Sequence, residues 1–114
     1  MSQASALASA QVRDAAPLFA ALGDETRFRL LVRLSAGGPG SIASLHAKFP
    51  VSRQAITKHL GVLEHAGLVR STRSGRQRIW ELDPRRLEDA HRYLESISRQ
   101  WDDALERLRK FVEE

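Results

Sequence analysis

The stretch VSRQAITKHLGVLEHAGLV, residues 51–69, has the pattern of one short helix with an apolar side and a polar side. Ser52 is a residue type favoured at a helix N-cap, and Gly67 is typical of the position after a helix ends, so the pattern predicts a helix over residues 53–66. Its buried stripe at helical spacing is Ala55, Ile56, Leu60 and Leu63. Its outward side is polar and basic, without an acid in the first two turns: Arg53, Gln54, Thr57, Lys58 and Gly61. Such a face is suited to binding a polyanion.

The residues just upstream predict another helix, joined to the first by a tight turn. Ser41 can cap a short helix over residues 42–48, and Pro50 breaks the chain before Ser52. The apolar residues of this short helix, Ile42, Leu45 and Phe49, are expected to face the core. Residues 41–66 therefore have the order of a helix-turn-helix.

Further upstream, two more helices are predicted, over residues 14–22 and 24–36. Gly23 ends the first, Asp24 caps the second, and residues 37–40 (Gly-Gly-Pro-Gly) are predicted to form a loop. In the second helix, apolar residues recur at helical spacing while the arginines point elsewhere: Phe28, Leu31, Val32 and Leu34 against Arg27, Arg29 and Arg33. Residues 1–11 are rich in Ala and Ser and lack both a basic start and a continuous apolar block, so no secretory signal is expected there. This N-terminal segment is expected to be disordered.

Downstream, residues 68–72 and 77–82 are rich in β-formers and predict a hairpin whose tip spans residues 73–76. We call this hairpin, residues 68–82, the wing. The order of helices, helix-turn-helix and hairpin predicts a mainly α fold with a small β-hairpin, a winged helix-turn-helix. Residues 12–114 would form one such domain.

The last predicted helix, residues 84–112, has the most regular pattern in the chain. Apolar residues recur every seven positions in two series: Leu87, Leu94, Trp101 and Leu108, and Ala90, Ile97, Ala104 and Phe111. At about 1.5 Å per residue the helix would be roughly 40 Å long, which is more than a domain of this size can cover. A second copy of the chain is the expected cover, so segment 84–112 is predicted to dimerise. The interface is expected to contain Leu87, Leu94, Ile97, Trp101, Leu105 and Leu108.

The positive charge is concentrated in the middle of the chain. The whole chain has a formal charge of +4, but residues 48–86 contain nine basic and three acidic residues, a net of +6. From residue 87 onward five basic residues meet eight acidic ones, a net of −3. This distribution predicts a cationic surface for double-stranded DNA and a separate structural tail.

The winged arrangement assigns roles to the basic and polar residues on the helix and on the wing. In the major groove Gln54 would read an adenine edge, Arg53 or Lys58 would reach guanine or phosphate, and Thr57 would contact either. Ser52 and the free amides of the helix start would bind a phosphate oxygen. On the wing, Arg73 and Arg76 would lie along the backbone or in the minor groove, with Arg70 and Arg78 further back on the strands.

Several classes of protein are disfavoured by what the sequence lacks. Without any cysteine, disulfides and thiolate metal sites are excluded, and a cytoplasmic location is expected. No apolar stretch approaches the roughly 20 residues of a membrane span. The sequence has no glycine-rich phosphate loop and no legible cluster of Ser, His and acid, so we predict no enzymatic activity and no cofactor. A winged helix that binds another protein instead of DNA remains open.

Three segments resemble the ArsR family of bacterial repressors. Residues 51–69 are similar to its recognition helix ending in Ala-Gly-Leu-Val, residues 19–31 (FAALGDETRFRLL) to its upstream helix, and residues 70–82 (RSTRSGRQRIWEL) to its wing. The resemblance implies a homodimer that binds an imperfect palindrome and usually blocks transcription. Its two copies would be joined by the first and last helices, here segments 12–22 and 84–112. The inducer and the operator are not specified by it.

The resemblance also raises a metal site, because some members of the family sense metals. The cysteines that some carry in the third-helix region are absent from SIASLHAKFPVS, residues 41–52. Asp89 and His91 match the first half of a second family site, but the expected partners fall on Asp102 and Leu105. Leucine cannot bind a metal, so no metal site is predicted. A metal-responsive regulator with a different, non-cysteine site remains an alternative.

Overall fold

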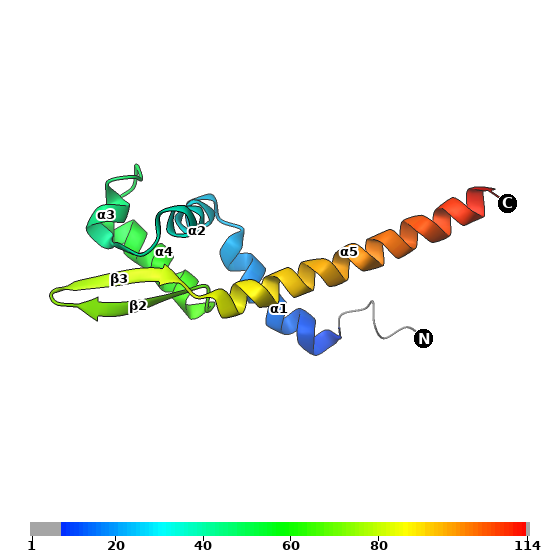
Figure 1. Ribbon diagram of the computed structural model, residues 1–114, viewed down its shortest axis with the longest axis horizontal. Helices are drawn as coiled ribbons and strands as arrows, with labels where there is room; N and C mark the ends of the chain where they lie inside the picture. The colour runs from blue at the N-terminus through cyan, green and yellow to red at the C-terminus, as the bar shows by residue number, and fades with distance from the viewer. Residues whose placement is uncertain (1–7, 114) are drawn as a thin grey trace.

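In the computed structural model, which describes residues 8–113, a small helical head carries one long projecting helix (Figure 1). The elements in chain order are α1 (Ser9–Leu22), α2 (Glu25–Gly37), β1 (Gly40–Ser41), α3 (Ile42–His46), α4 (Arg53–His65), β2 (Val69–Ser74), β3 (Gln77–Leu82) and α5 (Pro84–Glu113). The predicted winged helix-turn-helix is confirmed. Helices α3 and α4 begin at the residues expected, and α2 begins at Glu25, one residue after its predicted start at the N-cap Asp24. None of the described helices is long and apolar enough to cross a membrane.

The core lies where α1 to α4 meet the base of the wing. Its fully buried side chains are Leu18, Leu30, Leu45, Ile56, Leu60, Leu63, Leu68 and Val69. The predicted stripe of α4 is therefore confirmed at Ile56, Leu60 and Leu63, while Ala55 is half-buried. Trp80 of β3 closes the core from the wing and is 5% exposed. The buried stripe fixes α4, so that its opposite face points outward.

The first helix differs from its prediction in length. It begins at Ser9, five residues before the expected start, and the side chain of Gln11 accepts a hydrogen bond of 2.8 Å from the Ala8 amide. The alanine-rich composition favours helix here, and the helix continues through the exposed Pro17 although that residue has no amide to donate to the preceding turn. Residues 9–11 belong to α1, so the predicted disorder over residues 1–11 is wrong there. Residues 1–7 of that segment lie outside the described residues.

In α2 the division between apolar and basic faces was predicted incorrectly. Phe28 and Val32 are more than half exposed, whereas Leu30, Leu31 and Leu34 are buried. Arg27 points inward, and its guanidinium donates a 2.8 Å hydrogen bond to the Ala21 carbonyl at the end of α1. Arg27 is drawn inward by a contact between helices. The last carbonyl groups of α1 have no amide donor within their own helix, and the Arg27 guanidinium donates to them.

The wing is part of a three-stranded antiparallel sheet in the order β1-β3-β2. The short β1 pairs with β3 through Gly40 opposite Trp80, so the predicted loop over residues 37–40 is wrong at its last residue. Strand β2 runs to Ser74, two residues further than expected, which leaves Gly75 and Arg76 as the turn. Gly75 adopts a φ of 63°, a conformation that favours glycine, so the tip is tighter than predicted.

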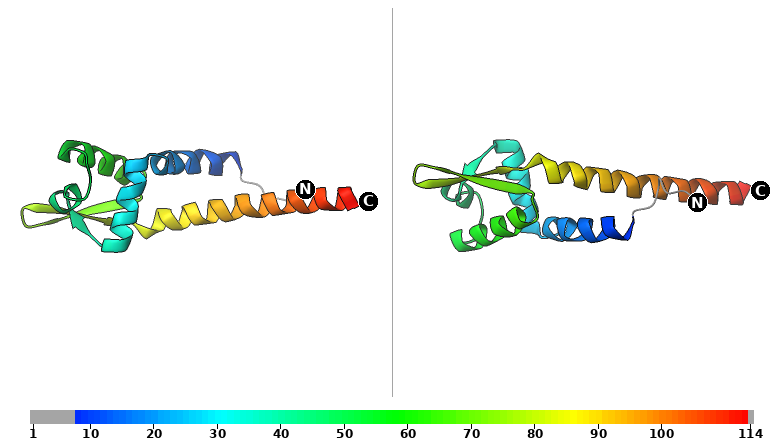
Figure 2. Two further views of the ribbon diagram at one scale, coloured as in Figure 1. Left: turned by 90° about the horizontal axis from the view of Figure 1, so that it is seen from above. Right: turned by 90° about the horizontal axis from the view of Figure 1, so that it is seen from below.

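Helix α5 leaves the head and continues well beyond it. The molecule measures 67 × 26 × 20 Å, with a radius of gyration of 18.5 Å, against about 13 Å for a compact chain of this length. In both views of Figure 2, α1 lies beside the first half of α5, and the second half extends alone. The far half of α5 is therefore uncovered within the described chain.

Asp83 holds the start of α5. Its carboxylate accepts hydrogen bonds from the Arg85 backbone amide (3.1 Å) and from the Arg85 guanidinium (2.7 Å to Oδ2), and its own amide donates to the Leu68 carbonyl. The Arg85 side chain and amide together lower the pKa of Asp83 to about 2. Asp83 therefore caps the helix and ties it to the end of α4.

This cap gives a testable pH dependence. We expect Asp83→Asn to lower the free energy of unfolding by about 1–2 kcal/mol at pH 7, because a helix cap and its charge-assisted hydrogen bonds are lost. Since the native pKa is depressed, this stabilisation is complete above the ordinary value of 3.8, and it is lost as the pH falls toward about 2. Urea denaturation of both proteins between pH 7 and pH 3 measures it. Asp103→Asn, at an exposed acid on α5, is the matched control; a difference that stays constant down to pH 3 would contradict the assignment.

Candidate nucleic-acid interface

The outward face of α4 is formed by side chains that the core leaves free. Arg53, Gln54, Thr57 and Lys58 are all exposed, as predicted. Ser52 caps the helix, with Oγ accepting a 3.1 Å hydrogen bond from the Ala55 amide. The Thr57 hydroxyl donates to the Arg53 carbonyl at 2.9 Å, which leaves its oxygen lone pairs and methyl group facing outward. The face thus offers a cation, an amide, a hydroxyl oxygen and a second cation over two turns.

On the wing, two of the predicted arginines lie directly opposite each other. Arg73 of β2 pairs in register with Arg78 of β3, so both side chains point to the same face of the hairpin. Closer to the base, that face carries Ser71, which links the guanidinium of Arg78 (2.8 Å) to the Glu64 carboxylate of α4 (3.0 Å). Arg73 and Arg78 therefore occupy the side of the wing that faces α4. Like charges placed opposite each other on neighbouring strands repel, so an anion bound beside Arg73 and Arg78 would relieve the repulsion between them.

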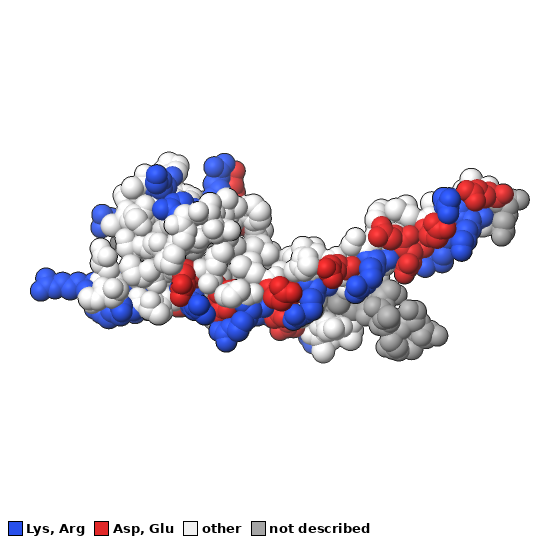
Figure 3. Space-filling model, in the orientation of Figure 1, with Lys and Arg blue, Asp and Glu red and all other residues white. Residues whose placement is uncertain are grey.

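Ion pairing divides the nine basic residues of the middle segment into two groups. Three form ion pairs with acids of the same chain, and these are Arg70 with Glu81, Arg85 with Asp83, and Arg86 with Asp14 and Asp89. The other six have no ion-pair partner within residues 8–113: Lys48, Arg53, Lys58, Arg73, Arg76 and Arg78. Figure 3 shows Lys and Arg gathered over the end of the wing, whereas α5 carries both signs along its length. Arg70 is therefore occupied within the wing, although its charge contributed to the predicted surface.

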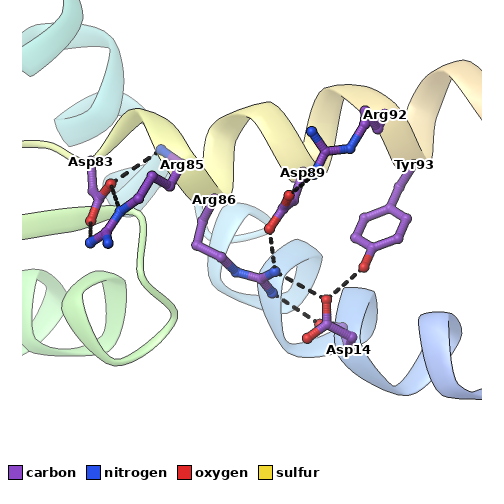
Figure 4. Close-up of polar contacts among 7 residues, drawn as sticks. All are labelled: Asp14, Asp83, Arg85, Arg86, Asp89, Arg92 and Tyr93. Carbon is purple, nitrogen blue, oxygen red and sulfur yellow. Dashed lines mark hydrogen bonds and ion pairs between the residues drawn. The ribbon is translucent and has the colours of Figure 1, made fainter.

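A polar cluster joins α1 to α5 and was not predicted from the sequence (Figure 4). Arg86 donates to the carboxylates of Asp14 (3.0 Å) and Asp89 (2.7 Å), and the Tyr93 hydroxyl donates to Asp14 at 2.6 Å. The Tyr93 and Arg86 hydrogen bonds lower the pKa of Asp14, and the Asp14 bond raises the pKa of Tyr93. The cluster holds the two helices side by side. Its members are 72 and 79 residues apart in the sequence, and no local pattern signals such a distance.

The same cluster reaches the corner between α4 and the wing. Gly67 has a φ of 80°, and a Cβ atom there would lie 2.7 Å from Cγ of Arg86. The glycine thus lets α5 pass close to the end of α4. On the inner side of α4, His59 Nδ1 lies 3.3 Å from the Arg27 guanidinium and 3.8 Å from Asp24. His59 is therefore a packing residue between helices, and it joins the middle of α4 to the start of α2.

Helix α5 carries a row of exposed apolar side chains that we call the α5 stripe: Leu94, Ile97, Trp101, Leu105 and Leu108. Trp101 is 65% exposed, and the others are about half exposed. Leu87 and Ala90 differ from the rest of the heptad pattern. Ala90 is buried in the core of its own chain, and Leu87 packs against that core. The apolar residues in the first turns of α5 therefore pack against the core of the same chain. From Leu94 onward, the apolar side chains of the α5 stripe are exposed.

The half-matched metal site is engaged in other contacts. Asp89 accepts hydrogen bonds from Arg86 and Arg92, and His91 lies 3.4 Å from Glu95. Within residues 8–113 of a single chain, no group of three or more His, Asp or Glu side chains is placed to hold a metal ion.

Comparison with known proteins identifies the class. A model of a helix-turn-helix domain family matches residues 22–72. The chain is 44% identical over 64 residues to the HTH-type transcriptional regulator Rv2034 of Mycobacterium tuberculosis, covering 56% of this chain and 59% of that protein. It is 43% identical over 68 residues to the uncharacterized HTH-type transcriptional regulator YuzN of Bacillus subtilis, covering 54% and 74% respectively.

Among solved structures, an ArsR-like transcriptional regulator from Rhodococcus sp. RHA1 superposes with a TM-score of 0.83 at 37% identity. That match covers 94% of this chain and 97% of the other. The fold and the helix-turn-helix thus define a winged-helix regulator. The chain belongs to the ArsR family of helix-turn-helix transcriptional regulators.

Proposed function

We propose that this protein is a cytoplasmic repressor that binds a palindromic DNA operator as a homodimer. In each copy α4 is the recognition helix, which enters the major groove, and the wing follows the neighbouring backbone. The observation that carries the proposal is the placement of the six basic residues without ion-pair partners in the described chain. They lie in the α3–α4 turn, on the outward face of α4 and on the wing.

The division of roles within this surface follows from reach and chemistry. Gln54 and Thr57 sit on the exposed first turns of α4, where an amide and a hydroxyl can read base edges. Arg53 and Lys58 flank them and reach guanine or phosphate, and the amides after Ser52 suit a phosphate oxygen. The opposed pair of Arg73 and Arg78 gains stability when a phosphate lies between the two guanidinium groups.

The dimer is supported by the α5 stripe, because about half or more of each of its apolar side chains is exposed in the single chain. A second copy related by a twofold axis would cover the stripe with the same residues. Two recognition helices held in this way would meet half-sites about one helical turn apart, or a multiple of that distance. Bound across a promoter, such a dimer would block transcription.

Selection of bound duplexes from a random pool tests the proposal. We expect the recovered sequences to be palindromic, and log K for them to fall with log salt by about 0.9 per phosphate contact. Repeating the selection with zinc and with a chelator tests whether binding depends on metal. Weak binding without sequence preference at moderate salt would contradict the proposal and favour a protein-docking role for the winged helix.

Variants on α4 and on the wing should behave differently. We expect Gln54→Ala and Thr57→Ala to change which bases are preferred, with a loss of about 1–3 kcal/mol at the affected position. Arg73→Ala and Arg76→Ala should weaken all duplexes alike and reduce the salt slope by roughly one unit for each phosphate that the variant no longer neutralises. Fluorescence anisotropy on cognate and scrambled duplexes at several salt concentrations separates the two. Identical effects from both groups would refute this division of roles.

A further inference from the structure

A groove of about 1100 Å³ runs between α2 and the turn that joins α3 to α4. One wall is the exposed side of α2, where Phe28, Val32 and Ala36 follow one another at intervals of one helical turn. The other wall is Phe49, Pro50 and Val51. Phe28 and Val32 are 54% and 53% exposed, so large apolar side chains line an open site far from the α5 stripe. Two apolar walls facing each other form a typical ligand groove.

The rim of this groove carries basic side chains that form no ion pair with an acid of the described chain. Arg33 and Lys48 line it, and neither forms an ion pair with any residue in the range 8–113. The Nη1 atom of Arg33 is buried and has no hydrogen-bond partner in the described structure. A buried donor of a charged group without an acceptor is costly. The guanidinium lies against Gly37, where a Cβ atom would be only 1.7 Å from Nη1, so the end of α2 is shaped around it.

The acids on the same rim are already engaged. Asp24 accepts a 3.0 Å hydrogen bond from the Arg27 amide as the N-cap of α2, and Glu25 pairs with Arg29 at 3.2 Å. The remaining charge of the groove is therefore positive, from Arg33 and Lys48. An apolar cleft with an unpartnered guanidinium is complementary to a small molecule that has an apolar body and one carboxylate.

We propose that this groove binds a small apolar carboxylate, with the carboxylate on Arg33 and Lys48 and the apolar part between Phe28, Val32 and Phe49. At about 1100 Å³ the groove is slightly larger than most sites for small molecules, which span roughly 300–1000 Å³, so a small carboxylate would fill only part of it. Val51 lines the groove and directly precedes Ser52, the N-cap of α4. A ligand there would move the turn that sets the recognition helix. This regulatory consequence rests on the proposed function, whereas the binding itself does not.

Amide NMR spectra of the labelled full chain, titrated with octanoate in the absence of DNA, test the site. We expect saturable shifts confined to residues 28–36 and 48–51. Octanol, which has the same chain length without the charge, should bind about tenfold more weakly, since a charge-assisted hydrogen bond of about 1.4 kcal/mol is absent. Arg33→Gln should weaken octanoate about tenfold and leave octanol unchanged. The control is Arg99→Gln, an exposed arginine on α5, which should change neither.

The outcomes distinguish binding in the groove from binding elsewhere on the chain. Shifts restricted to the α5 stripe, equal binding of octanol and octanoate, or no shift in the groove would each overturn the proposal. If Arg33→Gln does not fold, Lys48→Gln, at an exposed residue of the turn, provides the same charge test. DNA binding is measured separately by anisotropy with and without octanoate. Failure to bind DNA would then count against the proposed function, and failure of the NMR titration would count against the groove.

Discussion

Replacing Trp101 by alanine is expected to convert the proposed homodimer largely into monomers at micromolar concentration. Trp101 is 65% exposed in the single chain and lies in the middle of the α5 stripe, so it contributes little to the core of its own head. In a twofold dimer each copy supplies this side chain to the same interface, and burying an indole is worth several kcal/mol. We expect the dissociation constant to rise at least about a hundredfold, corresponding to roughly 3 kcal/mol.

Light scattering across a concentration series measures this change, and DNA affinity should fall with it because both half-sites must be held together. Arg99→Ala is the matched control, since residue 99 is exposed and lies on the other side of the helix, about 200° around from Trp101. Helical content should remain that of the parent protein in both variants. A wild-type chain that is monomeric at micromolar concentration would end the dimer proposal.

The second large effect is expected in the core beneath α4, the proposed recognition helix. Leu60 is fully buried on the inner face of α4, where it packs with side chains of the other helices. Leu60→Ala would remove three carbon atoms' worth of side chain and leave a cavity, which typically costs 2–5 kcal/mol. A small domain has a total free energy of unfolding of about 5–15 kcal/mol, so this substitution would remove a large part of it.

Urea denaturation at one fixed protein concentration measures the loss, because the stability of a dimer depends on concentration. Val62→Ala lies on the same helix at a side chain that is 40% exposed, and it should cost less than about 1 kcal/mol. Equal losses from the two substitutions would mean that α4 is not held by its inner stripe. The recognition helix would then need another anchor, such as its contacts with the wing.

The helical elements near the helix-turn-helix follow from local sequence. Ser41, Ser52 and Asp24 accept hydrogen bonds from backbone amides three residues ahead, and these N-caps were predicted from residue type alone. The 3.6-residue period of α4 separates its buried stripe from its polar face, so the candidate interface on that helix was also predictable. Local hydrogen bonding and periodicity need no knowledge of the rest of the fold.

The roles of individual arginines could not be predicted in this way. Arg70, Arg85 and Arg86 have the same charge as Arg73 and Arg76, yet the first three are paired with acids that register or folding brings near. The strand β1 was missed because Gly40 and Ser41 have no β pattern, and only the edge of β3 makes them a strand. The pairs Arg70–Glu81 and Arg86–Asp14 and the pairing of β1 arise from contacts between residues that are distant in the sequence, whereas Arg85–Asp83 is a local pair that the charge pattern did not reveal.

By itself, the sequence determined the order of the helices and of the two wing strands, the caps of α2, α3 and α4, the inner stripe of α4 and the long period of α5. These features depend on residues within one or two turns of each other, where side-chain direction follows from backbone geometry. The tertiary structure decided which cations remain without partners, which part of the heptad pattern is uncovered and where the α2 groove lies. Those depend on how the helices pack, because burial and ion pairing are properties of surfaces that only the folded chain brings together.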